Sequence, residues 1–183
     1  ILVLRQNGMS KGAWNRYAAK GSSNYDIFFP GLKYTMMDIQ AAIGSSQLRQ
    51  LESFNERRRK IVDFYMKELA GVRGIMLPRP AAWQYEHSWH IFTPFVDIDA
   101  LGFSRDEFMA RMKALNIGTA LHYQALHLFT CYGNITGLKR GSLPEAEYVS
   151  DRIVSLPLFP AMTDDDARDV VAAVREVCAK AAR

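Results

Sequence analysis

The sequence predicts a small two-layer α/β sandwich with a long helix at its N-terminal side. Helical and extended hydrophobic patterns alternate along most of the 183 residues. The candidate strands are short, and each helical pattern carries an apolar stripe that needs a second layer to cover it. Hydrophobic residues make up 49% and charged residues 23% of the chain, which is typical of a globular domain and excludes wholesale disorder.

Residues 1–35 are predicted to be a loop or linker, and residues 36–183 the sandwich domain. Glycine, proline, asparagine and serine interrupt any regular pattern between Gln6 and Leu32. This loop also contains aromatic residues, which are Trp14, Tyr17, Tyr25, Phe28 and Phe29. We expect the aromatic residues to pack either on this domain's own core or on another domain or subunit.

A helix is predicted from about Met36 to Leu69, because apolar residues recur there at steps of three and four and Gly71 follows the last turn. About 34 residues of helix span roughly 50 Å, whereas a compact domain of this length is roughly 40 Å across. We therefore expect the helix either to bend at residues 44–46 or to reach beyond the domain. The basic run at 57–60 is interpreted as its solvated face.

The later elements alternate between strand and helix. Strands are predicted at 88–98, 117–123 and 153–157, and Pro94 favours a sheet edge for the first of them. Helices are predicted after Ser104, around 145–152, and from Thr163 to the C-terminus. The first and last of these helices are predicted to begin with capping boxes, formed by Ser104 with Glu107 and by Thr163 with Asp166. Glycines at 133, 137 and 141 predict a loop between the second strand and the second helix.

Composition and motifs argue against several classes of protein. The aliphatic run at residues 1–4 is far shorter than the roughly 18 apolar residues of a membrane helix, and these residues do not show the pattern of a signal peptide. The net charge of +4 is spread along the chain, which does not favour nucleic-acid binding. Two cysteines cannot build a disulfide framework, so a reducing, cytoplasmic location is expected. No phosphate loop or serine elbow supports nucleotide hydrolysis, hydride transfer or a serine nucleophile.

The histidines are the first candidate functional residues. They form the pairs His87/His90 and His122/His127, with no cysteine or carboxylate nearby at ligand spacing, so no metal site is predicted. The segment 122–127 leaves a strand end, where ligand sites on α/β scaffolds form, and offers two imidazoles, a phenol and an amide. A structural, hydrogen-bonded role for each histidine remains an open alternative. Lys33 precedes the long helix, where a phosphate group can bind.

Six motifs follow one another in a recognisable order. They are residues 7–10 (NGMS), 30–34 (PGLKY), 36–44 (MMDIQAAIG), 87–92 (HSWHIF), 118–123 (GTALHY) and 155–160 (SLPLFP). In this order they resemble the DegT–StrS family of nucleotide-sugar aminotransferases, which depend on pyridoxal phosphate (PLP). The resemblance covers essentially the whole chain. The branch that makes UDP-4-amino-4-deoxy-L-arabinose is the most similar, on Lys33, the Trp89-His90 pair and the segment 122–127.

The resemblance implies the small C-terminal domain of a fold-type I PLP-dependent transferase that acts as a homodimer. It implies glutamate as the amino donor and a nucleotide-linked keto sugar as the acceptor, in the synthesis of cell-surface polysaccharide or lipopolysaccharide. In this family the lysine that forms the Schiff base with PLP lies in the large domain, which is expected to precede Ile1. We therefore expect no catalytic residue in this chain, and the chain alone is expected to be inactive and to bind no PLP.

The resemblance also implies the site residues. It assigns Lys33 and Thr35 to cofactor binding, with Lys33 reaching the cofactor phosphate of the neighbouring subunit, although Thr35 stands where many members carry arginine. Residues expected to line the sugar-nucleotide pocket are His122, Tyr123, His127, Trp89 and His90. A reading from another class remains open, namely a stand-alone carbohydrate-binding or protein-interaction module without catalysis.

Overall fold

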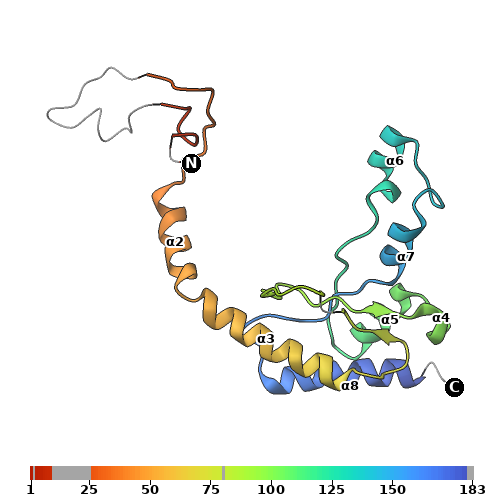
Figure 1. Cartoon of the computed structure of the whole chain (residues 1–183). Helices are drawn as coiled ribbons and strands as arrows, with labels where there is room; N and C mark the ends of the chain where they lie inside the picture. The colour runs from red at the N-terminus through yellow and green to blue at the C-terminus, as the bar shows by residue number, and fades with distance from the viewer. Residues whose placement is uncertain (2, 10–25, 80, 181–183) are drawn as a thin grey trace. The chain divides into compact units, whose positions relative to one another are not determined.

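The computed structural model describes residues 1, 3–9, 26–79 and 81–180, and Figure 1 shows the course of the chain. Contacts divide the chain into two compact units, Ile1–Leu51 and Glu52–Arg183, which are described separately. Of the aromatic residues in the predicted N-terminal loop, Trp14, Tyr17 and Tyr25 lie outside the described residues.

In the first unit, the segments 3–9 and 27–34 are joined by backbone hydrogen bonds, such as the one from the Phe28 N–H to the Gly8 carbonyl (3.0 Å). The two segments approach so closely that a Cβ on Gly8 or on Gly31 would collide with the backbone of the opposite segment. Gly8 also has a φ of +74°, a conformation that glycine adopts without strain. Gly8 and Gly31 are therefore required for this crossing.

The predicted single helix from Met36 to Leu69 is wrong, because the structure contains two helices, α2 (Asp38–Leu48) and α3 (Leu51–Glu68). Residues 44–46, where a bend was expected, are helical. The interruption lies at Arg49 and Gln50. The Gln50 N–H donates to the Gln47 carbonyl (3.0 Å) and its side-chain amide donates to the Ser46 carbonyl (3.3 Å). These bonds form a tight turn in place of the regular helical ladder. No residue of α2 is buried.

A short antiparallel sheet forms the middle of the second unit. Strand β1 (Ile75–Met76) pairs with β2 (Phe95–Val96), with Ile75 opposite Val96. Isolated bridges extend the pairing from Phe92 to Leu156, from Phe95 to Ile153 and from Ala120 to Ser155. The three predicted strands are thus present in position but are much shorter than predicted, and β1 was not predicted.

Two local features explain why the first predicted strand, 88–98, is short. Trp89 has a φ of +46°, which ends the extended backbone before the pairing begins. At the other end, helix α4 (Ile98–Leu101) begins directly after β2, and Asp97 caps it by accepting a hydrogen bond from the Ala100 N–H (3.0 Å).

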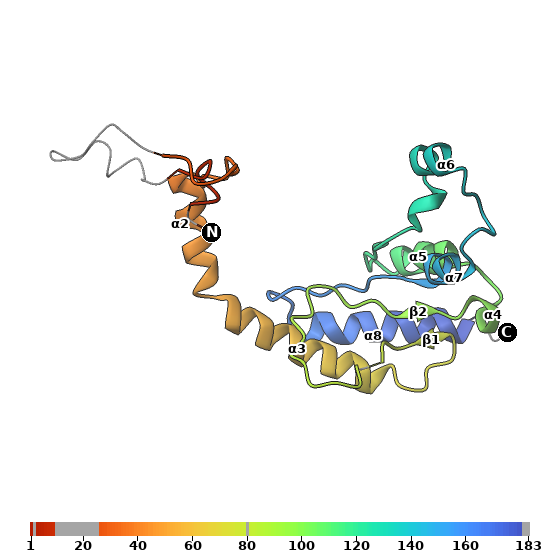
Figure 2. The ribbon, with the colours of Figure 1, turned by 45° about the horizontal axis from the view of Figure 1, so that its top comes forward.

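One face of the sheet forms the core. Phe92, Pro94 and Val96 are buried in alternation, as the period of two in a strand requires. Helices α3 and α8 (Asp164–Ala179) run next to each other (Figure 2), and both contribute buried residues to this core. The α3 residue Tyr65 is fully buried, with its ring centroid 5.4 Å from that of Phe92 and its hydroxyl donating to the Pro157 carbonyl (2.9 Å). The predicted α/β class is confirmed.

The basic run at 57–60 is only partly a solvated face. Arg57 donates from Nε and Nη2 to the Met162 carbonyl (3.1 and 2.6 Å). Its Nη1 forms an ion pair with Asp164 (2.7 Å). Arg57 therefore connects α3 to the start of α8, whereas Lys60 pairs with Glu56 at the surface (2.8 Å).

The predicted capping boxes differ in outcome. Both reciprocal hydrogen bonds between Thr163 and Asp166 are present at the start of α8, as predicted. At the start of α5 (Arg105–Ala114), Ser104 accepts a bond from the Glu107 N–H (3.2 Å). The Glu107 carboxylate instead binds Arg111 one turn later (2.8 Å), so this second box is only half formed.

The loop predicted around the glycines at 133, 137 and 141 is present only at 137–143, because the residues before it are largely helical. They form the short 3-10 helix η1 (Leu126–Leu128) and helix α6 (Thr130–Thr136). Gly133 lies inside α6, and Gly137 ends it with a φ of +71°. The next helix, α7 (Pro144–Arg152), is close to its predicted position.

Candidate functional site

The two cofactor-binding candidates, Lys33 and Thr35, lie in the first unit. Lys33 pairs through its backbone with Gln6, and both candidate side chains are exposed. Lys33 forms no ion pair within the described part of the chain. The neighbouring Arg5 has a buried Nε without a hydrogen-bond partner among the described residues. The paired segments thus present two cationic side chains that can receive an anionic group.

In the second unit, the segment 122–127 is bonded at three points to residues of α7 and the chain that follows it. His122 Nδ1 and the Ser155 hydroxyl are 2.7 Å apart. The Ala125 N–H donates to the Ser150 hydroxyl (3.0 Å). His127 Nε2 lies 2.9 Å from Oε1 of Glu147. The structural role that the sequence left open is therefore observed for both His122 and His127.

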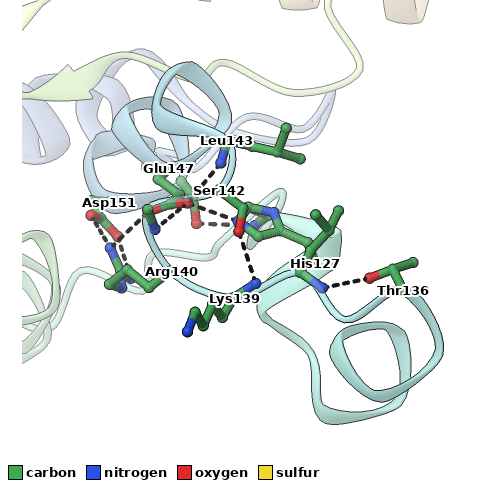
Figure 3. Close-up of polar contacts among 12 residues, drawn as sticks. His127, Thr136, Lys139, Arg140, Ser142, Leu143, Glu147 and Asp151 are labelled. Atoms are coloured by element: carbon green, nitrogen blue, oxygen red, sulfur yellow. Dashed lines mark hydrogen bonds and ion pairs between the residues drawn. The ribbon is translucent and has the colours of Figure 1, made fainter.

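Figure 3 shows the contacts of the Glu147 carboxylate at the centre of this arrangement. Besides His127, it accepts hydrogen bonds from the Gly141 N–H (2.8 and 2.9 Å to its two oxygens) and from the Leu143 N–H (3.2 Å). The bond from the Gly141 backbone, followed by that from His127, lowers the pKa of Glu147 to about 2. Glu147 is therefore an ionised carboxylate, although only 7% of it is exposed.

The other substrate-binding candidates differ from these anchored histidines. Tyr123 is 73% exposed, and its ring packs edge-on against His122. Trp89 is half-buried and stacks on His87 with ring centroids 3.9 Å apart, whereas His90 is exposed.

The register of the sheet separates these candidates into two sets. Phe92 pairs with Leu156 in antiparallel orientation, so the residues that precede Phe92 lie beside those that follow Leu156. Ala120 pairs with Ser155 in antiparallel orientation, so the residues that follow Ala120 lie beside those that precede Ser155. The segment that holds His122, Tyr123 and His127 therefore leaves the sheet toward the start of residues 153–157. The Trp89-His90 pair lies toward the end of residues 153–157.

The residues that hold the segment 122–127 were not predicted from the sequence. Glu147, Ser150 and Ser155 are buried, with exposed fractions of 7%, 3% and 5%. The spacing of three between Glu147 and Ser150 is a signal for one shared helix face. Nothing in the sequence indicated that this face is buried or which segment it contacts.

A cavity of about 760 Å³ lies beside β1, β2 and α7, with Phe95, Tyr148 and Ile153 in its wall. None of the predicted substrate residues lines this cavity. Within the described ranges, no group of three or more His, Cys, Asp or Glu side chains is arranged to bind a metal ion. In those same ranges, no helix has the length and apolar character needed to cross a membrane.

Nearly the whole chain is similar to proteins of one enzyme family. Residues 1–175 match the DegT/DnrJ/EryC1/StrS aminotransferase family. The spore coat polysaccharide biosynthesis protein SpsC of Bacillus subtilis is 38% identical over 178 residues, which are 97% of this chain and 46% of SpsC. The uncharacterized protein MJ1066 of Methanocaldococcus jannaschii is 41% identical over 177 residues, with the same two coverages of 97% and 46%.

Among solved structures, the putative sugar aminotransferase Spr1654 of Streptococcus pneumoniae in its PMP-form matches with a TM-score of 0.79 and 29% identity. The match covers 98% of this chain and 44% of Spr1654. Spr1654 has also been solved in a PLP-form, which matches with a TM-score of 0.77. The chain spans about half the length of the curated relatives it matches.

Proposed function

The chain belongs to the DegT/DnrJ/EryC1/StrS aminotransferase family, and on this premise we propose that its protein transfers an amino group from glutamate to a nucleotide-linked keto sugar. The family resemblance and the fold class predicted from the motifs are thereby confirmed. The observation that carries the proposal is the match of residues 1–175 to this family, joined to the similarity with the sugar aminotransferase Spr1654.

The proposed cofactor is PLP, and the residues of the first unit fit its phosphate group. Lys33 is an exposed cation without an ion-pair partner in the described residues, and the Arg5 Nε is buried nearby without a hydrogen-bond partner there. We propose that Lys33 binds the phosphate by charge and that the Thr35 hydroxyl adds a hydrogen bond, across the interface of a homodimer. When bound, PLP supplies the electron sink that amino transfer requires.

The proposed sugar-binding group is the segment 122–127. Ser155 holds Nδ1 of His122, which leaves Nε2 of this ring without a partner in the described residues. In our proposal this nitrogen and the exposed phenol of Tyr123 orient the hydroxyl groups of the sugar. His127 is bonded to Glu147 and contributes by holding the segment in place. Roles for Trp89 and His90 at the same pocket remain predictions.

The finer assignments are also proposals. SpsC is named for spore coat polysaccharide biosynthesis, which supports a product destined for a cell-surface polysaccharide or lipopolysaccharide. The proposal that the acceptor is a UDP-linked 4-keto-pentose is supported by the motifs alone. A cytoplasmic location is supported by the free state of both cysteines, Cys131 and Cys178. The alternative of a stand-alone binding module is disfavoured, because the match to an enzyme family extends over residues 1–175.

The test uses the product of the whole gene. The purified protein should carry bound PLP, whose visible absorbance should fall when glutamate is added and return when a nucleotide-linked keto sugar follows. Lys33→Ala should weaken PLP binding about ten- to a hundredfold, because this is the change in affinity that the loss of one charged hydrogen bond produces. Lys67→Ala, which changes an exposed lysine on α3, is the matched control and should bind PLP as the wild type does. A protein that takes up no PLP, or whose bound PLP does not respond to glutamate, refutes the proposal.

A further inference from the structure

We propose that Glu147 is a positioning residue of the sugar site, whose carboxylate holds the segment 122–127 against the loop 137–143 so that Tyr123 faces the substrate. This inference rests on the proposed function. It assigns a role to a side chain that lies outside the predicted substrate-binding set.

The Glu147 carboxylate joins several segments of the chain. Glu147 lies on α7, accepts from the His127 ring in the segment 122–127, and accepts from the Gly141 N–H in the loop 137–143. The Leu143 N–H, at the start of α7, donates to the same carboxylate. The segment 122–127 is therefore held at one buried point against the loop 137–143 and the helix α7 that directly follows this loop.

The hydrogen bond between Glu147 and His127 has a defined direction. An ionised carboxylate only accepts hydrogen bonds, so Nε2 of His127 must carry the proton and donate. The tautomer and the orientation of the ring are thereby set. The other charged groups near Glu147 do not compete for this contact. Arg140 lies 3.8 Å from Oε2 of Glu147 but makes its closer bonds, 2.8 and 3.1 Å, to Asp151.

The ends of the segment 122–127 are fixed by hydrogen bonds, whereas side chains between them are exposed. Its ends and one backbone N–H are bonded to Glu147, Ser150 and Ser155, all of them buried. Between these bonds, Tyr123 and Leu126 are 73% and 65% exposed. A short segment whose polar groups are fixed from behind presents its remaining side chains in a defined position, which is how preorganised binding sites gain affinity.

The experiment separates positioning from general stability. In the whole gene product, Glu147→Gln keeps the size of the side chain but removes its charge and turns an amide NH₂ toward either the Gly141 N–H or the His127 donor. We expect KM for the keto sugar to rise about tenfold, while the rate of the half-reaction with glutamate stays within about twofold of the wild type. Glu145→Gln, on the same helix turn but exposed, is the matched control and should leave both unchanged.

Two further measurements complete the test. The ¹⁵N spectrum of the His127 ring should show the Nε2–H tautomer in the wild type and a mixture in Glu147→Gln. Ser150→Ala removes only the acceptor of the Ala125 N–H and should produce a smaller rise in KM for the keto sugar. This variant decides the question if Glu147→Gln does not fold.

The outcomes are distinct. An active wild type together with an unchanged KM for the keto sugar in Glu147→Gln and Ser150→Ala overturns the inference alone. Equal losses in both half-reactions also overturn it, because they indicate general damage to the fold. A wild type that transfers no amino group to any keto sugar overturns the proposed function, and the inference that rests on it falls as well.

Discussion

Replacing Tyr65 by Phe tests the contact that joins α3 to the sheet. Tyr65 is fully buried, its ring packs on Phe92, and its hydroxyl donates to the Pro157 carbonyl at 2.9 Å. Tyr65→Phe keeps the ring but leaves this carbonyl without its donor. Because an unsatisfied buried acceptor costs about 1–3 kcal/mol, the free energy of unfolding should fall by about that amount at neutral pH.

The same substitution has a second signature at high pH. Burial, and to a smaller degree the carboxylate of Asp166, raises the pKa of Tyr65 above its ordinary value of 10. The folded state therefore keeps the phenol proton that the unfolded chain loses above pH 10, so the contribution of Tyr65 to stability is complete below pH 10 and declines above it. The decline approaches about 1.4 kcal/mol per pH unit. Between pH 10 and pH 11, the difference in free energy of unfolding between the wild type and Tyr65→Phe should therefore shrink by about 1 kcal/mol.

Urea unfolding followed by circular dichroism, at pH 8, 10 and 11, measures both effects. The control is Tyr132→Phe, since Tyr132 is 49% exposed and its change should stay within about 0.5 kcal/mol at pH 8. Equal stabilities of wild type and Tyr65→Phe at pH 8 would refute the hydrogen bond. A difference that stays constant up to pH 11 would refute the buried, protonated phenol.

Two further predictions concern Glu147 and the glycine crossing. Hydrogen bonds, foremost from the Gly141 N–H, hold the pKa of Glu147 at about 2, so its stabilising effect is complete above the ordinary value of 4.5 and is lost as the pH falls toward 2. The urea midpoint of the wild type should therefore converge on that of Glu147→Gln over this range, and a constant separation would contradict the reasoning. Gly8→Ala should remove the hydrogen-exchange protection of the backbone amides in 27–34, because its Cβ would collide with that segment. Gly44→Ala, where a Cβ meets nothing within 4 Å, should preserve it, and equal protection in both variants would contradict the close approach.

Elements with a strong local signal were predicted well. Thr163 and Asp166 form the predicted capping box, and α8 follows with its predicted apolar stripe in the core. Both groups of the box belong to neighbouring residues, so their bonds do not depend on the rest of the chain. Glu107 illustrates the limit of such a signal, because Arg111 lies one turn away and takes the carboxylate that the box required.

Elements that depend on distant partners were predicted poorly. The glycines at 133 and 137 suggested a loop, yet helix α6 holds one within it and ends at the other. The strands were overestimated in length, because an extended pattern does not reveal how many of its residues find a partner. The sequence alone does not tell whether Glu145 or Glu147 is the buried carboxylate. Only the position of His127 in the fold distinguishes Glu147 from the exposed Glu145.

The sequence by itself determined the family, the α/β class and the starts of α5 and α8, which Ser104 and Thr163 cap as predicted. These follow from residue order and from interactions between near neighbours, which are the same in any context. Only the tertiary structure decided that the segment 122–127 is held by Glu147, Ser150 and Ser155. Pairing across such separations depends on which arrangement of the whole unit satisfies its buried polar groups, and that is a property of the packed molecule.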